Sequence, residues 1–268
     1  MDVVDDTFQG AELTADHSHV TEQREDVSRF VIHLTRDDRG DFTHGASARK
    51  NFLRILKEQK IIGFRPHCLH SAKLKMLSAD LRKSFCVACF TEVPLSQVRH
   101  LIGSIEGRQI ELSSYGFVFT KKYLIEKGAQ PAIYINSYDG NMHLREAVDT
   151  IFEKAQEGNF KGKIWRLLPF INAMHERYDF TWEREWRVRG TFTFSINKLV
   201  CAILPPDGND DVREALATAG IAAISPTWTY ERIVAELALQ QRKTRVIIKG
   251  LASATARGEK VAKDVTES

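Results

Sequence analysis

The sequence predicts an α+β fold, in which helices flank a mixed or antiparallel sheet. Short apolar runs of strand length, rich in β-branched and aromatic residues, recur along the chain. Segments whose apolar residues have helical spacing lie between these runs. Because 43% of the 268 residues are hydrophobic, the chain can enclose a substantial core. These observations favour a central mixed sheet covered by helices.

The N-terminal half supplies four expected strands and two expected helices. The strands are the apolar runs at residues 30–35, 85–90, 115–119 and 132–135. The segment 51–56 has apolar residues at 52, 53, 55 and 56, which suits a helix buried along one side and ending before Gly63. A second helical segment, 95–102, follows the break at Pro94.

The C-terminal half begins with two expected helices, at residues 142–157 and 163–176. Strands are expected at Trp182–Phe194 and at 199–204, followed by a helix at 211–219 and a strand at 221–224. The last element is an amphipathic helix, whose apolar face carries Tyr230, Ile233, Val234 and Leu237.

The two ends differ in composition from the rest of the chain. Residues 1–26 are acidic and residues 251–268 are small and polar, so both are predicted to be disordered tails. No repeat or linker interrupts residues 27–250, which are predicted to form a single α+β domain.

Charge and hydropathy limit the classes of function. Lysine and arginine number 38 and aspartate and glutamate 35, so the net charge of +3 does not by itself imply a nucleic-acid partner. No apolar run approaches the roughly 20 residues that span a bilayer, and the first residues lack the pattern of a signal peptide. We therefore expect a soluble cytoplasmic protein with no membrane partner.

The densest functional signal is the charged segment 181–189. If it is a strand, one face carries Trp182, Arg184, Trp186 and Val188, and the other carries Glu183, Glu185, Arg187 and Arg189. Two carboxylates beside two guanidinium groups could orient a sugar hydroxyl, stabilise a cationic transition state or shift a carboxyl pKa. On spacing alone, a solvated ladder of ion pairs on an outer strand is the better interpretation.

Two other groups of residues offer weaker signals. His33 stands alone in an apolar strand, where a hydrogen-bonded core histidine is the alternative to a functional one. Cysteine and histidine at 68, 70, 86 and 89 have zinc-like separations, but a strand over 85–90 would turn Cys86 and Cys89 to opposite sides. We therefore expect buried free thiols and no metal.

No known phosphate-binding or nucleophile motif is present. The chain lacks Gly-x-x-x-x-Gly-Lys-Ser/Thr, Gly-x-Gly-x-x-Gly and Gly-x-Ser-x-Gly. Their absence counts against P-loop, Rossmann and α/β-hydrolase chemistry.

Several blocks of the sequence resemble the AbiGi family of bacterial abortive-infection proteins. They are Val31–Thr35, Asn51–Leu56, Cys89–Leu95, Tyr115–Phe119 and Trp182–Arg187, within a similarity over about residues 30–240. Proteins of this family are described as the antitoxin half of a phage-resistance pair. The resemblance therefore implies phage defence and a cognate toxin or antitoxin as partner.

The same blocks resemble the ADP-ribosyltransferase fold, especially its DarT-like branch, whose split sheet binds NAD in a cleft. The resemblance implies that His33 contacts the nicotinamide ribose, Tyr115 stacks on nicotinamide and Glu185 binds a ribose hydroxyl, with Glu183 as a second catalytic carboxylate. Thr35 and Asn51, in the matching strand and helix, complete the expected NAD-binding set. The chain departs from the DarT-like pattern because the segment Cys89–Leu95 lacks that branch's arginine.

Three functions follow as hypotheses. The first is an NAD-dependent ADP-ribosyltransferase of anti-phage defence that modifies a nucleic acid or a protein. The second is a non-enzymatic antitoxin that acts by binding a protein. The third, a nuclease-like or other hydrolytic role, ranks lowest because no acidic trio with metal-ligand spacing is evident.

Overall fold

The computed structural model describes residues 24, 26–38, 45–65, 70–108, 110–138, 142–174 and 179–241. The tail predicted at 251–268 lies outside the described residues, and so does the tail predicted at 1–26 except for Arg24 and Asp26. Asp26 is not detached from the body of the protein, because its carboxylate lies 2.9 Å from the guanidinium of Arg184.

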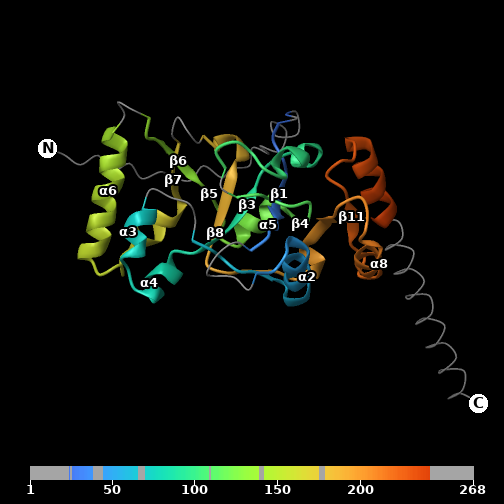
Figure 1. The fold of residues 1–268 in the computed structure, drawn as a ribbon, viewed down its shortest axis with the longest axis horizontal. Coiled ribbons are helices and arrows are strands. Elements are labelled where there is room, and N and C mark those ends of the chain that lie inside the picture. The colour runs from blue at the N-terminus through green and yellow to red at the C-terminus, as the bar shows by residue number, and fades with distance from the viewer. Residues whose placement is uncertain are drawn as a thin grey trace, which may run out of the picture.

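A seven-stranded sheet forms the centre of the molecule (Figure 1). Its strands, in spatial order, are β11 (Ala222–Ile224), β10 (Leu199–Ile203), β4 (Gly116–Thr120), β1 (Phe30–Leu34), β3 (Val87–Thr91), β8 (Glu185–Arg189) and β5 (Gln130–Pro131). Neighbouring strands are antiparallel except for β10 and β11, which are parallel. The predicted α+β class with a mixed sheet and flanking helices is confirmed.

Two smaller sheets lie beside the central one. Strand β2 (Lys60–Ile61) pairs antiparallel with β9 (Phe192–Thr193). Strand β6 (Ile133–Asn136) pairs parallel with β7 (Ile171–Met174). A close approach of two glycines joins the first small sheet to the central one, since a Cβ built on Gly63 would lie 2.2 Å from the carbonyl oxygen of Gly190.

The helices are α2 (Ala48–Glu58), α3 (Ser71–Lys75), α4 (Ala79–Ser84), α5 (Lys121–Glu126), α6 (Met142–Glu157), α7 (Lys163–Leu167) and α8 (Asp210–Thr218), and residues 230–241 are also helical. Four of the helices, α3, α4, α5 and α7, have only 5 or 6 residues each. The 3₁₀ turns are η1 (Leu95–Leu101), η2 (Leu168–Phe170), η3 (Thr181–Glu183) and η4 (Ile196–Lys198). Helix α2 begins where the Ser47 hydroxyl accepts the Lys50 N–H, and it ends at Gln59 in the left-handed conformation.

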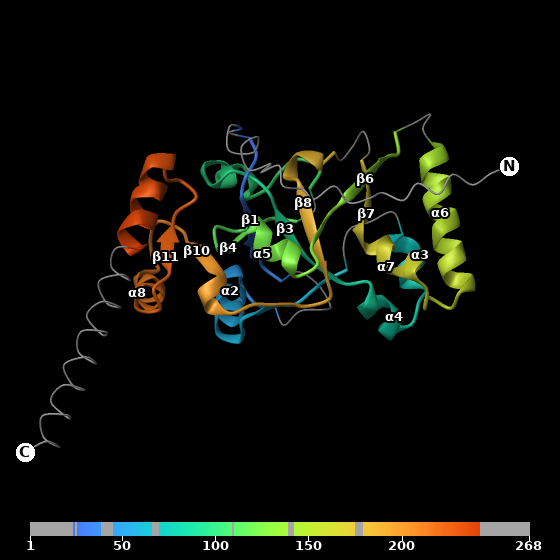
Figure 2. The same ribbon diagram turned by 180° about the vertical axis from the view of Figure 1, so that it is seen from behind.

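Three apolar clusters hold these elements together. One packs α2 and α5 against the sheet through residues such as Phe52, Phe117 and Leu124. A second includes Leu101 of η1 and Ile233 of the last helix. The third is formed by α3, α4, α6, α7 and β7, which we call the helical lobe. The lobe lies at one end of the molecule, and α8 and the last helix lie at the other (Figures 1 and 2).

Two expected elements are wrong in part. The strand expected at Trp182–Phe194 is divided into η3, β8 and β9, because Arg184 and Gly190 adopt positive φ values of 46° and 71°. The helix expected at 163–176 ends at Leu167, because Pro169 cannot continue it, and the chain then enters β7.

The predicted apolar face of the last helix is also wrong in part. Ile233 is buried, but Tyr230 is 67% exposed and Val234 is 45% exposed. The helix therefore packs through a narrower stripe than the spacing of apolar residues predicted.

Candidate active site

A cavity of about 460 Å³ lies against the central sheet. Residues of β1, α2, β3 and β8 line it, together with residues 60–62, 64, 65, 107, 108, 110 and 112. Of the six residues expected at the site, five line this cavity: His33, Thr35, Asn51, Glu183 and Glu185. The sixth, Tyr115, is not among its lining residues.

His33 presents one fixed hydrogen-bonding atom to the cavity. Its Nδ1 lies 2.9 Å from the carbonyl oxygen of Cys89 on the neighbouring strand. Since a carbonyl only accepts, Nδ1 carries the proton, and Nε2 of the neutral ring is an acceptor. Burial lowers the pKa of His33 to about 4, despite the hydrogen bond to Cys89, so the ring is neutral near pH 7.

Glu185 accepts hydrogen bonds from two side chains on two strands. Its Oε2 accepts from Nη2 of Arg187 at 2.7 Å and from the hydroxyl of Tyr134 at 3.4 Å. Burial, and after it the charge of Glu185, raises the pKa of the nearby Cys89 thiol well above its usual value. The two hydrogen bonds from Arg187 and Tyr134 restrict the movement of the Glu185 carboxylate.

Arg187 is the most deeply buried charged partner at the site. Its side chain is 1% exposed, and its Nη1 donates to the carbonyl oxygen of Pro169 at 2.7 Å. Although burial alone would lower the pKa of Arg187, the adjacent Glu185 raises it, so the guanidinium stays charged. The pair therefore places a fixed negative and a fixed positive charge at one wall of the cavity.

Glu183 lies at the same part of the cavity, beside Arg108. Its Oε1 accepts from Nη1 of Arg108 at 3.1 Å. Burial raises the pKa of Glu183 above its usual value, and the hydrogen bond and charge of Arg108 only partly oppose this rise. The negative charge of Glu185 raises it further. A carboxylate with a raised pKa is suited to accept a proton during a reaction.

The interpretation of Glu183 and Glu185 as a solvated ladder is wrong. The side chains of Glu185 and Arg187 are 16% and 1% exposed, and those of Glu183 and Arg108 are 20% and 7% exposed. Arg184 takes the left-handed conformation between the two glutamates, so they belong to a turn and a strand rather than to one continuous strand. Both nevertheless line the cavity.

Three of the expected NAD-binding residues have internal partners. Tyr115 donates its hydroxyl to Asn209 at 2.9 Å and packs its ring on Phe52, so its expected role as a stacking platform in the cavity is corrected to packing. The Thr35 hydroxyl lies within hydrogen-bonding distance of the Ala48 and Tyr115 carbonyl oxygens, which ties β1 to α2 and β4. Asn51 donates to the Arg36 carbonyl and to Asp38.

The cavity has a second end, around Phe64. Four cationic residues, Arg36, Arg54, Lys60 and Arg65, line the cavity, and so does the carboxylate of Asp38. Phe64 is 38% exposed, and the Arg36 guanidinium carbon lies 5.8 Å from the centre of its ring. An exposed aromatic ring among cations can stack on a flat apolar or heteroaromatic group, and the cations favour an anion nearby.

The register of β3 separates the two ends. Phe64 bridges to Val87 at the start of β3, and Glu185 pairs with Thr91 at its end. Four residue steps along a strand correspond to about 13 Å. The cavity therefore runs from the end around Phe64 to a carboxylate end, with His33 nearer the carboxylates because Ile32 pairs with Thr91.

Three residues of the carboxylate end were not predicted from the sequence. Tyr134 was assigned only to an apolar strand, Arg108 lies in a turn without periodic context, and Cys89 was treated as a structural thiol. Burial and the charge of Glu185 raise the pKa of Tyr134 above its usual value, so it keeps its proton and donates. A polar residue within an apolar strand, as at Tyr134, was the one available signal.

The described cysteines are free thiols with different surroundings. Cys86 precedes β3 rather than lying in it, Cys89 lies within β3, and Cys201 is buried in β10. The prediction that Cys86 and Cys89 face opposite sides of one strand is therefore wrong in its premise. Among the described residues, no group of three or more His, Cys, Asp or Glu side chains could hold a metal ion.

Comparisons with known proteins leave the family open. The chain matches no protein-family model, and no curated protein and no solved structure shows significant similarity to it. No helix in the described part of the chain is both long enough and apolar enough to cross a bilayer.

Proposed function

We propose that the cavity binds NAD and that the protein transfers ADP-ribose from it to a nucleic acid or a protein, as part of a bacterial defence against phage. The fold that this implies is the split sheet of the ADP-ribosyltransferases. The observation that carries the proposal is the meeting of His33, Glu183 and Glu185 in one cavity, although His33 is about 150 residues from the two glutamates in sequence.

The layout of the cavity supports a dinucleotide of this kind. Its volume of about 460 Å³ is in the range of small-molecule and cofactor sites. The cationic residues suit the pyrophosphate and the exposed Phe64 ring suits the adenine, while the carboxylate end suits the ribose beside nicotinamide. The acceptor nitrogen of His33 lies on the carboxylate side, where it would bind a ribose hydroxyl.

The two carboxylates suit different steps of the transfer. The bond between ribose C1′ and the nicotinamide nitrogen breaks, and its electron pair leaves with neutral nicotinamide. Glu185, immobilised by Arg187 and Tyr134, stabilises the cationic ribose carbon that remains. A nucleophilic oxygen or nitrogen of the acceptor then bonds to C1′, and its proton passes to Glu183, whose pKa is raised.

The experiment is to incubate the purified protein with NAD labelled in the adenylate part and with bacterial lysate, then to measure label on macromolecules and nicotinamide released. Glu185→Gln keeps the shape of the side chain and one acceptor oxygen beside Arg187 but removes the charge, so we expect transfer to fall about 10²–10³-fold. Glu146→Gln, on the exposed face of α6, is the matched control and should transfer normally.

The same experiment, with a toxin-neutralisation assay, distinguishes the transferase proposal from the antitoxin hypothesis. If the wild-type protein neither labels macromolecules nor releases nicotinamide, the transferase proposal fails. If it instead neutralises a co-expressed toxin and Glu185→Gln does so equally well, the antitoxin hypothesis replaces it.

A further inference from the structure

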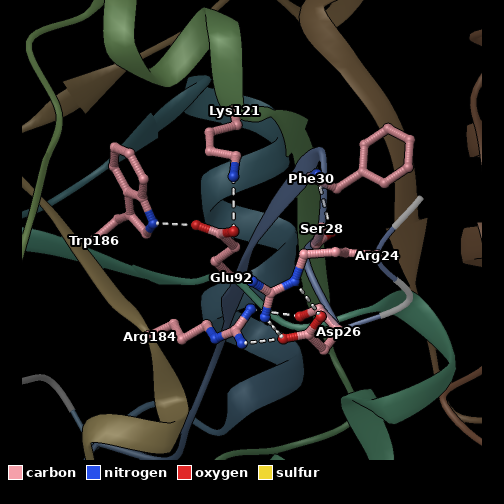
Figure 3. Close-up of polar contacts among 8 residues, drawn as sticks. All are labelled: Arg24, Asp26, Ser28, Phe30, Glu92, Lys121, Arg184 and Trp186. Carbon is pink, nitrogen blue, oxygen red and sulfur yellow. Dashed lines mark hydrogen bonds and ion pairs between the residues drawn. The ribbon is translucent and has the colours of Figure 1, made fainter. Parts of the chain in front are cut away.

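Glu92, directly after β3, is a buried carboxylate that the proposed chemistry does not use. It is 8% exposed and does not line the cavity. Its Oε1 accepts from Nζ of Lys121 at 2.7 Å, and its Oε2 accepts from Nε1 of Trp186 at 2.8 Å. Figure 3 shows the carboxylate between these two donors. Burial of a charge is unfavourable, so a carboxylate that is buried with a partner for each oxygen is expected to have a structural or functional role.

The contacts of Glu92 bracket Glu185 on both sides along the chain. The backbone N–H of Glu92 donates to the carbonyl oxygen of Arg184, the residue before Glu185, at 3.2 Å. Its side chain accepts from Trp186, the residue after Glu185. One residue therefore holds both neighbours of the carboxylate that lines the cavity.

The backbone at this point requires such support. Arg184 has a φ of 46°, a left-handed conformation that is unfavourable for a residue with a side chain and persists only where the surroundings impose it. Its guanidinium donates to the backbone and carboxylate of Asp26, as Figure 3 shows. Thr91, the neighbour of Glu92, donates its hydroxyl to the Glu183 carbonyl oxygen.

We infer that Glu92 is a positioning residue, which fixes the backbone of residues 184–186 and thereby the direction of the Glu185 carboxylate. The effect of Glu92 on catalysis rests on the proposed function, whereas its effect on the backbone of residues 184–186 does not depend on that function. The ammonium group of Lys121 offsets the negative charge of Glu92, which lowers the cost of burying this carboxylate.

The kinetic test compares three variants with wild type in the nicotinamide-release assay. Glu92→Ala removes the acceptor for Trp186, and Trp186→Phe removes the donor. In both we expect kcat to fall about 10-fold or more with KM within about threefold, because a misplacement of about 1 Å is enough to slow a reaction strongly. Glu92→Gln keeps an acceptor oxygen for the indole N–H and should restore kcat to within about threefold of wild type.

A merely structural role would give a different result. It would lower the folded fraction, so kcat per folded molecule would stay at the wild-type value in all three variants. That result, or a Glu92→Gln variant as slow as Glu92→Ala, overturns the inference.

Hydrogen exchange tests the positioning without any activity. The amides of Glu92 and Ala132 donate to the carbonyl oxygens of Arg184 and Glu185. In Trp186→Phe we expect these two amides to exchange at least about 10-fold faster, while amides of β1 and β4 keep their protection. Unchanged exchange at both amides overturns the inference, whereas a wild type without NAD turnover overturns only the proposed function.

Discussion

Two histidines, His33 and His70, lie in different regions and have different surroundings. His33, at the cavity, has its Nδ1 bonded to the Cys89 carbonyl. His70, which begins the helical lobe, is 1% exposed, and neither ring nitrogen has a hydrogen-bond partner among the described residues. Its ring stacks on the ring of Phe152, with 4.7 Å between the ring centres, and its Nδ1 lies 3.7 Å from the carboxylate of Asp149.

The ion pairs of the two regions differ in how far they are exposed to solvent. The cavity pair of Glu185 and Arg187 is 16% and 1% exposed, while the lobe pair of Asp149 and Lys73 is 37% and 40% exposed. Charges are thus buried at the cavity with several partners each, whereas the lobe leaves its charges in water. Burial of satisfied charges in one place, at a cavity wall, is what distinguishes a candidate site from an ordinary packed layer.

The largest expected effect comes from breaking the buried pair. Glu185→Ala leaves the Arg187 guanidinium without its carboxylate, so the free energy of unfolding should fall by about 3–5 kcal/mol. Urea denaturation followed by circular dichroism measures this. A loss below about 1 kcal/mol would mean that water reaches Arg187 and that the two regions do not differ as described.

An intermediate effect is expected from acid. Burial lowers the pKa of His70 to about 4 from the usual 6.5, so between these values the unfolded chain binds a proton that the folded chain does not. The contribution of His70 to the free energy of unfolding is therefore fully present above about pH 6.5. It is lost as the pH falls toward 4, by up to about 3 kcal/mol.

The variant His70→Leu isolates that contribution. It should flatten the fall of unfolding free energy between pH 6.5 and 4 by up to about 3 kcal/mol relative to wild type, while the similar contribution of His33 remains. Denaturant titrations at several pH values measure the slope. Identical pH profiles for the variant and the wild type would show that the His70 ring is hydrated.

The smallest effect is expected from the exposed pair. Lys73→Met removes the contact with Asp149 at 2.7 Å and should change the free energy of unfolding by at most about 1 kcal/mol, because both side chains are well solvated. The change should shrink further in 0.5 M salt, as measured by the same titration. A change as large as that of Glu185→Ala would remove the contrast between the regions.

Sequence patterns predicted the strands of the sheet better than the points where a strand is interrupted. The strands near Phe30, Val87, Gly116 and Leu199 were found because their apolar runs are long and uninterrupted. The strand expected across Arg184 was not continuous, since a positive φ at a residue other than glycine leaves no mark in composition. The helix over 142–157 has the predicted bounds, because its apolar spacing is regular.

The candidate site was predictable where a residue stood out from its own strand or segment. His33 and the two glutamates did so, and they line the cavity. Tyr115 stood out equally but packs on Phe52, because the direction of a residue at the edge of a strand depends on where that strand begins. Arg108 could not be found, since only the fold brings its turn beside Glu183.

The strand order also sets when the cavity can exist during synthesis. Strands β1, β3 and β4 are complete by residue 120, but β8, which carries Glu185, pairs with β3 across a sequence separation of 94 residues between Thr91 and Glu185. At roughly 5–20 residues per second, the ribosome needs about 5–19 s to add that interval. For this time the nascent chain has an unpaired edge at β3 and no carboxylates beside His33. A growing chain therefore has no complete cavity until most of the protein has been made.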